Sequence, residues 1–225
     1  MYFDSTILIL LPAILFALWA QSRVKSTYAK YSKEFAGLTG EEAARMVLEM
    51  NGVNDVTIEP IAGELTDHFD PKTNTIRLSK GVYDVTSVAA VGIAAHEAGH
   101  AGQYAVGYSP IKLRTAIIPV TNIGSTLSWP ILLVGILLGS ETLAMAGVIL
   151  FCAVVLFQLV TLPVEFNASN RALDTLGASG YLQEGQLNGA GKVLRAAAMT
   201  YVAALAQALA QLLRLMLIAN RSRRD

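Results

Sequence analysis

The sequence has little charge, one cysteine and only three histidines. Charged residues make up 15% of the 225-residue chain, whereas a typical soluble domain has about 25%. Hydrophobic residues reach 53%, and the net charge is zero. This composition predicts a protein that contacts the lipid bilayer. It gives no basic surface of the kind that binds nucleic acid.

A single cysteine excludes a disulfide framework within one chain. Cys152 lies inside an apolar run of the sequence. We therefore expect it to be a small buried hydrophobic residue without a functional role.

The first long apolar stretch covers about residues 2–20. No lysine or arginine precedes it, whereas Arg23, Lys25, Lys30 and Lys33 follow it. A cleaved signal peptide carries its positive charge in front of the apolar stretch. Residues 1–22 are thus predicted to be an uncleaved membrane anchor, with the N-terminus outside and the basic flank in the cytoplasm.

Two further stretches, about 117–138 and 143–164, are each long enough to cross a bilayer. The segment between them, residues 139–142, has no positive charge, whereas Lys112 and Arg114 precede the pair. Residues 116–164 are predicted to form a transmembrane hairpin with its tip outside and both ends in the cytoplasm.

A fourth apolar stretch, about residues 196–219, carries Gln207, Gln211 and Arg214 at helical spacing. Three arginines follow it near the end of the chain, and a full span would place them outside, against the positive-inside rule. A membrane-associated or bundle-packed helix is favoured over a span. The last region, residues 165–225, ends in this helix.

Residues 23–115 have charge and turn residues, and are predicted to form a small cytoplasmic α+β portion. Thr39 and Glu42 have the spacing of a capping box for a helix that reaches about Met50. Alternating residues predict strands at 56–61, where Pro60 indicates an edge or an end, and at 75–79.

The next predicted helix contains the candidate metal-binding and catalytic residues. Thr86 or Ser87 caps it, and it extends to about Tyr104. Within it lies the motif His-Glu-x-x-His, at residues 96–100. Residues four apart on a helix share one face, so both imidazoles can bind one zinc ion while the glutamate faces its open position. The motif is typical of a zinc peptidase.

A catalytic zinc site needs a third protein ligand. A third histidine six residues after the motif is absent, since Val106 stands there. The remaining candidates are His68 and a carboxylate. Glu165 is the best carboxylate because it follows the third apolar stretch, which returns the chain to the predicted cytoplasmic side. A carboxylate at that depth is costly unless it is paired or binds a metal.

The chain resembles the small bacterial membrane-embedded neutral zinc metallopeptidases, glutamate zincins similar in logic to the heat-shock and CAAX-processing membrane proteases. The resemblance is carried by the basic-flanked anchor, by residues 67–71 and 75–79, by the histidine motif, and by Leu-Pro-Val-Glu-Phe-Asn-Ala-Ser at 162–169. It implies one zinc ion per chain, with His96, His100 and Glu165 as ligands and Glu97 as catalytic base.

One position departs from the broader glutamate-zincin pattern. An aspartate often follows the ligand glutamate by four residues and orients a histidine, and here that position is Ser169. Either Ser169 or Asn170 can accept a histidine N–H, and Asp174 is a further alternative. Tyr201 and His68 are candidate oxyanion donors. Asn74 begins a segment, 74–79, that is either an edge strand onto which an extended substrate adds or a plain structural strand.

The sequence therefore predicts a mainly α-helical integral membrane bundle, with three spans, a C-terminal membrane-associated or spanning helix and a zincin-like cytoplasmic portion. The expected function is zinc-dependent hydrolysis of peptides or proteins, membrane proteins among them, at the cytoplasmic face of the inner membrane. A zinc-binding membrane scaffold without catalysis is the alternative. No charged residue lies well inside the second and third stretches, which argues against a transporter.

Overall fold

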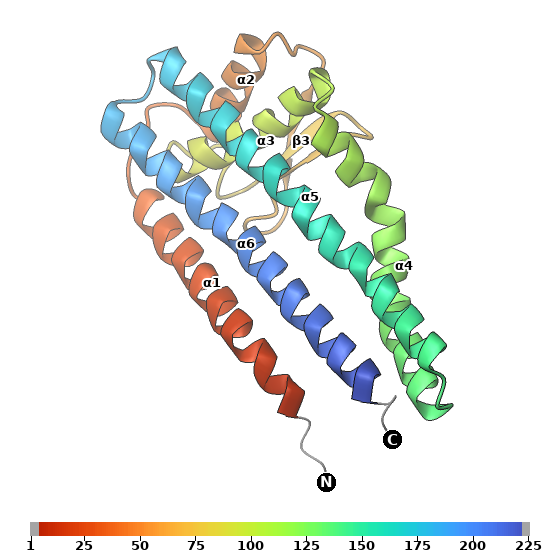
Figure 1. Ribbon diagram of the computed structural model, residues 1–225. Helices are drawn as coiled ribbons and strands as arrows, with labels where there is room; N and C mark the ends of the chain where they lie inside the picture. The colour runs from red at the N-terminus through yellow and green to blue at the C-terminus, as the bar shows by residue number, and fades with distance from the viewer. Residues whose placement is uncertain (1–4, 222–225) are drawn as a thin grey trace. The chain divides into compact units, whose positions relative to one another are not determined.

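The computed structural model describes residues 5–221 and is mainly helical (Figure 1). The described part of the chain forms two compact units. Within the described residues, we call 5–20, 113–162 and 200–221 the helical unit, and 21–112 and 163–199 the mixed unit. The elements in chain order are η1 (Ser5–Leu10), α1 (Leu11–Tyr31), α2 (Gly40–Met50), β1 (Thr57–Ile61), β2 (His68–Asp70), β3 (Thr75–Ser79), α3 (Val88–Ala105), α4 (Ser109–Leu137), α5 (Glu141–Ser179) and α6 (Glu184–Arg221).

The helical unit has its own hydrophobic core, in which side chains of α4, α5 and α6 pack together. Leu132, Phe151 and Leu215 are among its buried members. Small residues let α4 and α5 approach closely, since a Cβ added at Gly147 would lie 2.6 Å from the carbonyl oxygen of Ser128. Such contacts between small residues are typical of helices that associate within membranes.

Four helical segments of the described chain are long and apolar enough to cross a membrane: Thr6–Tyr31, Ser109–Leu137, Glu141–Ser179 and Glu184–Asn220. All four apolar stretches of the sequence are thus helical, and each helix is longer than its apolar stretch. The predicted first residues, 2–4, and the basic residues after Arg221 lie outside the described part. One prediction was wrong: Cys152 is exposed, because it lies on an outward face of α5.

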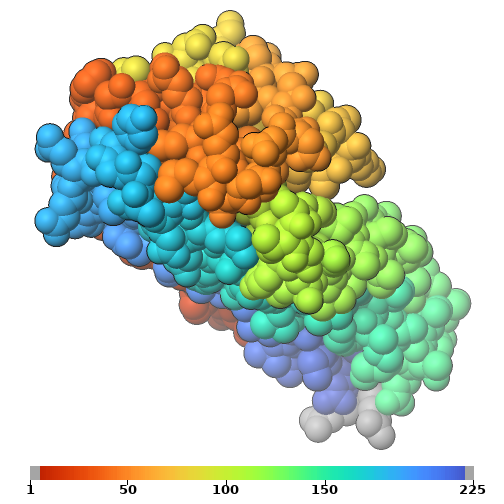
Figure 2. All heavy atoms as spheres, turned by 90° about the horizontal axis from the view of Figure 1, so that it is seen from above, coloured from red at the N-terminus to blue at the C-terminus, as the bar shows by residue number. Residues whose placement is uncertain are grey.

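The mixed unit holds a three-stranded sheet, α2, α3 and parts of the longer helices. The predicted capping box at Thr39 and Glu42 is confirmed, and α2 ends at Met50 as expected, with Asn51 as its C-cap. The buried face of α2 packs against the core, while its exposed face carries Arg45 and Glu49. Figure 2 shows α2, in orange, on the surface of this unit. Ser87 is the N-cap of α3.

The strand order is β1-β3-β2, with β1 parallel and β2 antiparallel to β3. Of the two interpretations of residues 74–79, the structure excludes the edge strand and agrees with the plain structural strand. β3 is the central strand, and four of its five residues are buried. The edge strands are β1, which contains Pro60, and β2. Sequence patterns missed β2 because a three-residue strand shows no alternation.

Candidate metal centre

Both histidines of the motif lie on one face of α3, one helical turn apart. Their ring centroids are 4.7 Å from each other. The helix is rich in alanine and glycine, and a Cβ added at Gly99 would lie 2.5 Å from the carbonyl oxygen of Ala168. Small side chains on α3 therefore let α5 approach closely at this point.

The third residue comes from α5. Glu165 Oε2 lies 3.3 Å from His96 Nε2 and 3.5 Å from His100 Nε2. The side chains of His96, His100 and Glu165 are 15%, 11% and 3% exposed. Their candidate ligand atoms all lie within 4.8 Å of one another. The structure thus brings together the three residues that the sequence suggested as ligands.

The other ring nitrogen of each histidine faces a protein oxygen. His96 Nδ1 lies 3.1 Å from Ser169 Oγ, and His100 Nδ1 lies 3.0 Å from Gln103 Oε1. With Nδ1–H donating to these oxygens, each Nε2 carries a lone pair directed at Glu165. Of the three sequence candidates for orienting a histidine, the structure places Ser169 in that position, whereas Asp174 is exposed.

These donors fit a zinc ion. Two imidazole nitrogens and one carboxylate oxygen form a ligand set of catalytic zinc, which leaves a fourth position open. Three converging lone pairs repel one another unless positive charge lies among them. Burial disfavours the charged form of His100. In that form, however, the imidazole donates a hydrogen bond to Glu165, and this bond together with the negative charges of Glu97 and Glu165 outweighs burial and raises the pKa of His100. The pocket therefore attracts positive charge.

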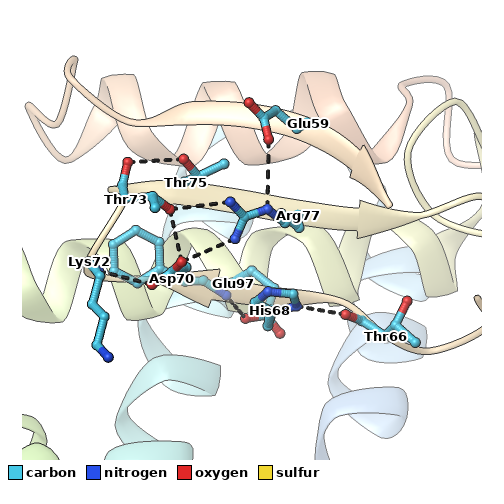
Figure 3. A network of polar contacts seen from close by, with 10 residues as sticks. Glu59, Thr66, His68, Asp70, Lys72, Thr73, Thr75, Arg77 and Glu97 are labelled. Atoms are coloured by element: carbon cyan, nitrogen blue, oxygen red, sulfur yellow. Dashed lines mark hydrogen bonds and ion pairs between the residues drawn. The ribbon is translucent and has the colours of Figure 1, made fainter. Parts of the chain in front are cut away.

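Glu97 lies beside the three residues on α3 and is buried. Its Oε2 accepts a hydrogen bond from the backbone N–H of Phe69, at 3.0 Å (Figure 3). Because this N–H points away from β3, it belongs to the free edge of β2. The carboxylate predicted to be the catalytic base therefore lies at the edge of the sheet.

A network of charges holds β2 in place (Figure 3). Arg77 on β3 lies 3.2 Å from Asp70 on one side and 3.7 Å from Glu59 of β1 on the other. Asp70 also accepts hydrogen bonds from the Lys72 N–H and the Thr73 hydroxyl. These contacts, with that from Arg77, lower the pKa of Asp70 to about 2. Glu97 contacts one edge of β2, and the contacts of Asp70 with Arg77 of β3 fix the opposite edge.

Two further residues suggested by the sequence, His68 and Asn74, are not part of this cluster. His68 is exposed on β2, and its Nδ1 lies 2.8 Å from the Thr66 carbonyl oxygen. Asn74 lies in the turn before β3, with φ of 51°, and donates to the Asp55 carbonyl. Tyr201 belongs to α6 in the helical unit, and its role as an oxyanion donor stays a prediction.

Two contributors to the site were missed at the level of sequence. Gln103 is fully buried and contacts His100, and its only sequence signal is its position seven residues after His96 on the same helix face. The second is the backbone N–H of Phe69, which donates to Glu97 and cannot be predicted from a pattern of side chains. Both become visible only when α3, α5 and β2 are placed together.

This geometry defines a candidate metallopeptidase centre in a chain with four helices suited to a membrane. The chain belongs to a family of neutral zinc metallopeptidases: the family described as "Putative neutral zinc metallopeptidase" matches residues 6–220. A protein of Bacillus subtilis (strain 168), "Putative membrane protease YugP", is 47% identical over 214 residues, which cover 94% of this chain and 95% of that protein. No solved structure matches the chain. The four apolar helices and this relative together identify a membrane protein.

Proposed function

We propose that this protein is a zinc-dependent endopeptidase of the cytoplasmic membrane, with one zinc ion per chain held by His96, His100 and Glu165. The convergence of their three donor atoms in a largely buried pocket carries the proposal. Bound there, zinc would act as a Lewis acid towards a peptide carbonyl and make water acidic enough to ionise near neutral pH.

Glu97 is the residue that moves the proton. One of its carboxylate oxygens removes a proton from the attacking water, and the same carboxylate then delivers a proton to the nitrogen of the leaving amine. The peptide C–N bond breaks, and a carboxylic acid and an amine leave the site. Glu97 follows His96 on α3, is buried, and its charge acts on His100.

The free edge of β2 supplies a place for an extended substrate. An exposed strand edge can pair with a peptide through main-chain hydrogen bonds, which gives affinity without a fixed sequence. On this edge the N–H of Phe69 already donates to Glu97, at 3.0 Å. A substrate strand that pairs there would take over this N–H and release the Glu97 carboxylate for proton transfer. The substrate is thus a peptide or an unfolded protein segment, membrane proteins included.

The charge distribution supports a site near the cytoplasmic face. The basic residues that follow the first span and precede α4 favour the cytoplasm for the segment that contains α3. Glu165 follows the apolar part of α5 and lies in the same mixed unit as α3.

A zinc-binding scaffold without catalysis is the second candidate. It would need the three ligands, but it would not need a carboxylate at position 97. The test is to measure zinc content of the detergent-purified protein and cleavage of unfolded polypeptides, for the wild type and for Glu97→Gln, Glu165→Ala and His68→Ala.

We expect one zinc per chain in the wild type, in Glu97→Gln and in His68→Ala, and loss of zinc in Glu165→Ala. Glu97→Gln should lose cleavage by at least 100-fold, the lower end of general acid–base effects. Zinc that persists in Glu165→Ala would refute the ligand set. Unchanged cleavage by Glu97→Gln would refute the proposed base, and zinc without any cleavage in the wild type would favour the scaffold.

A further inference from the structure

A chain of hydrogen bonds extends from the imidazole of His100 on α3 to Arg171 on α5. His100 Nδ1 lies 3.0 Å from Gln103 Oε1. Gln103 Nε2 donates to the Val164 carbonyl at 2.8 Å and to Asn167 Oδ1 at 3.0 Å. The same oxygen of Asn167 accepts a hydrogen bond from Arg171 Nε, also at 3.0 Å.

Two groups in this network, the Val164 carbonyl and the Arg171 guanidinium, fix the direction of its hydrogen bonds. A main-chain carbonyl only accepts and a guanidinium only donates. The Gln103 amide nitrogen must therefore face Val164, and the Asn167 amide oxygen must face Arg171. This leaves the Gln103 oxygen for His100, so His100 carries its proton on Nδ1. The lone pair of Nε2 then faces Glu165, as a metal ligand requires.

The burial of Gln103 makes this arrangement strict. The Gln103 side chain is fully buried. It is a polar residue on a helix whose buried residues before the histidine motif are all alanine, valine or glycine. A buried amide without partners is costly, and here both of its hydrogens and its oxygen are used. Because Val164 precedes Glu165, the same amide also joins the helix of two ligands to the helix of the third.

We propose that Gln103 is a positioning residue of the metal site, held by Asn167 and Arg171 in the one amide orientation that keeps His100 Nε2 available to the metal. This inference depends on the proposed function, because it assumes that the ligand cluster binds zinc. It adds to that function the residue that sets the tautomer and the ring orientation of His100. Loss of such an outer partner typically weakens metal binding by about 10- to 100-fold.

The experiment measures zinc affinity of the full-length protein in detergent by competition with a chelator, together with the thermal midpoint of the metal-free protein. Gln103→Met keeps the length of the side chain without its hydrogen bonds. Gln103→Glu still accepts from His100, but it turns an oxygen towards Val164 and Asn167. Arg171→Met and Asn167→Leu test the far end of the chain. Asn170→Leu is the matched control, since Asn170 is an exposed amide on the same helix.

We expect Gln103→Met and Gln103→Glu to weaken zinc binding by about 10- to 100-fold. Asn167→Leu and Arg171→Met should weaken it by a smaller factor, and Asn170→Leu should not change it. Bound Co²⁺ should show altered visible absorption in the same variants, because its spectrum follows ligand geometry.

Unchanged zinc affinity in Gln103→Met overturns the proposal even if the thermal midpoint falls, since Gln103 would then be a packing residue only. If the Gln103 variants do not fold, unchanged affinity in both Asn167→Leu and Arg171→Met overturns it instead. A wild-type protein that binds no zinc would refute the proposed function itself, which distinguishes the two failures.

Discussion

Gly99 of α3 lies directly against the main chain of Ala168 on α5. A Cβ at position 99 would be 2.5 Å from the Ala168 carbonyl oxygen and 3.2 Å from its carbonyl carbon. Real Cβ atoms do not approach a backbone so closely, so a larger residue must separate the helices. This contact lies between two ligands, because Gly99 precedes His100 and Ala168 follows Glu165 by three residues. The spacing of α3 and α5 thus sets the spacing of the ligands.

We expect Gly99→Ala to lower the stability of the metal-free protein by about 1–3 kcal/mol, the usual cost of overpacking. It should also weaken zinc binding, because Glu165 moves away from the histidines. The measurements are the thermal midpoint in detergent and the zinc affinity.

Gly102 provides the control on the same helix. Nothing lies within 4 Å of a Cβ added there. Gly102→Ala should therefore raise stability by about 0.5–1 kcal/mol, since alanine is favoured over glycine inside a helix. Equal effects of the two substitutions would contradict the role assigned to the contact with Ala168.

Ser169 orients the other histidine. Its hydroxyl oxygen lies 3.1 Å from His96 Nδ1, and its side chain is buried. We expect Ser169→Ala to weaken zinc binding by about 10- to 100-fold, because the imidazole loses the partner that fixes its orientation. Ser169→Asp should bind zinc at least as tightly as Ser169→Ala, since a carboxylate also accepts from Nδ1–H. The measurement is the zinc affinity of these variants, with Asn170→Ala as the control. Unchanged affinity in Ser169→Ala would rule out a role for Ser169 in orienting His96.

The sequence predicted those parts of the fold that depend on local signals. The capping residues Thr39 and Ser87 mark the starts of α2 and α3, and the apolar stretches mark the long helices. The histidine motif gave two members of the site from helical spacing alone. Glu165 required the argument about membrane side and the family resemblance, because nothing local links it to α3.

The remaining features depend on tertiary contacts. β2 has only three residues, and its pairing with β3 is visible only once the sheet is assembled. The donor to Glu97 is a main-chain N–H, which any residue at position 69 except proline could supply. Gln103 is recognisable only from its partners on α5. The hydropathy of the fourth stretch likewise shows a helix but not what packs against it.

Acid should loosen the turn that follows β2. The N–H of Lys72, the hydroxyl of Thr73 and the guanidinium of Arg77 lower the pKa of Asp70 to about 2. The folded-state pKa lies below the unfolded value of about 3.9, so this stabilisation is present above pH 4 and is lost as the pH falls towards 2.

The check compares thermal midpoints of the wild type and of Asp70→Asn between pH 5 and pH 2. We expect the wild type to be the more stable at pH 5 and the difference to shrink towards pH 2. A difference that stays constant over this range would show that Asp70 does not titrate in it.

Contacts within the helical unit relate the end of α6 to the α4–α5 turn. Arg214 Nε donates to Thr6 Oγ1 at 3.4 Å, and its guanidinium lies 5.5 Å from the ring centroid of Trp129. Thr6 is near the start of the chain, and Trp129 lies in the part of α4 that leads to the α4–α5 turn. The start of η1, this turn and the end of α6 therefore lie at one end of the unit (Figure 1).

If the α4–α5 turn is outside, as its lack of basic residues indicates, α6 should cross the membrane and end outside too. This would go against the preference for a membrane-associated helix that its arginines suggested. The test introduces single cysteines at Ser140, Asn220 and Lys33 in a Cys152→Ser background, and labels intact cells with an impermeant maleimide. We expect labelling at positions 140 and 220 without permeabilisation, and at position 33 only after it. Because Ser140 reports the turn independently, labelling there but not at Asn220 would mean that α6 does not span.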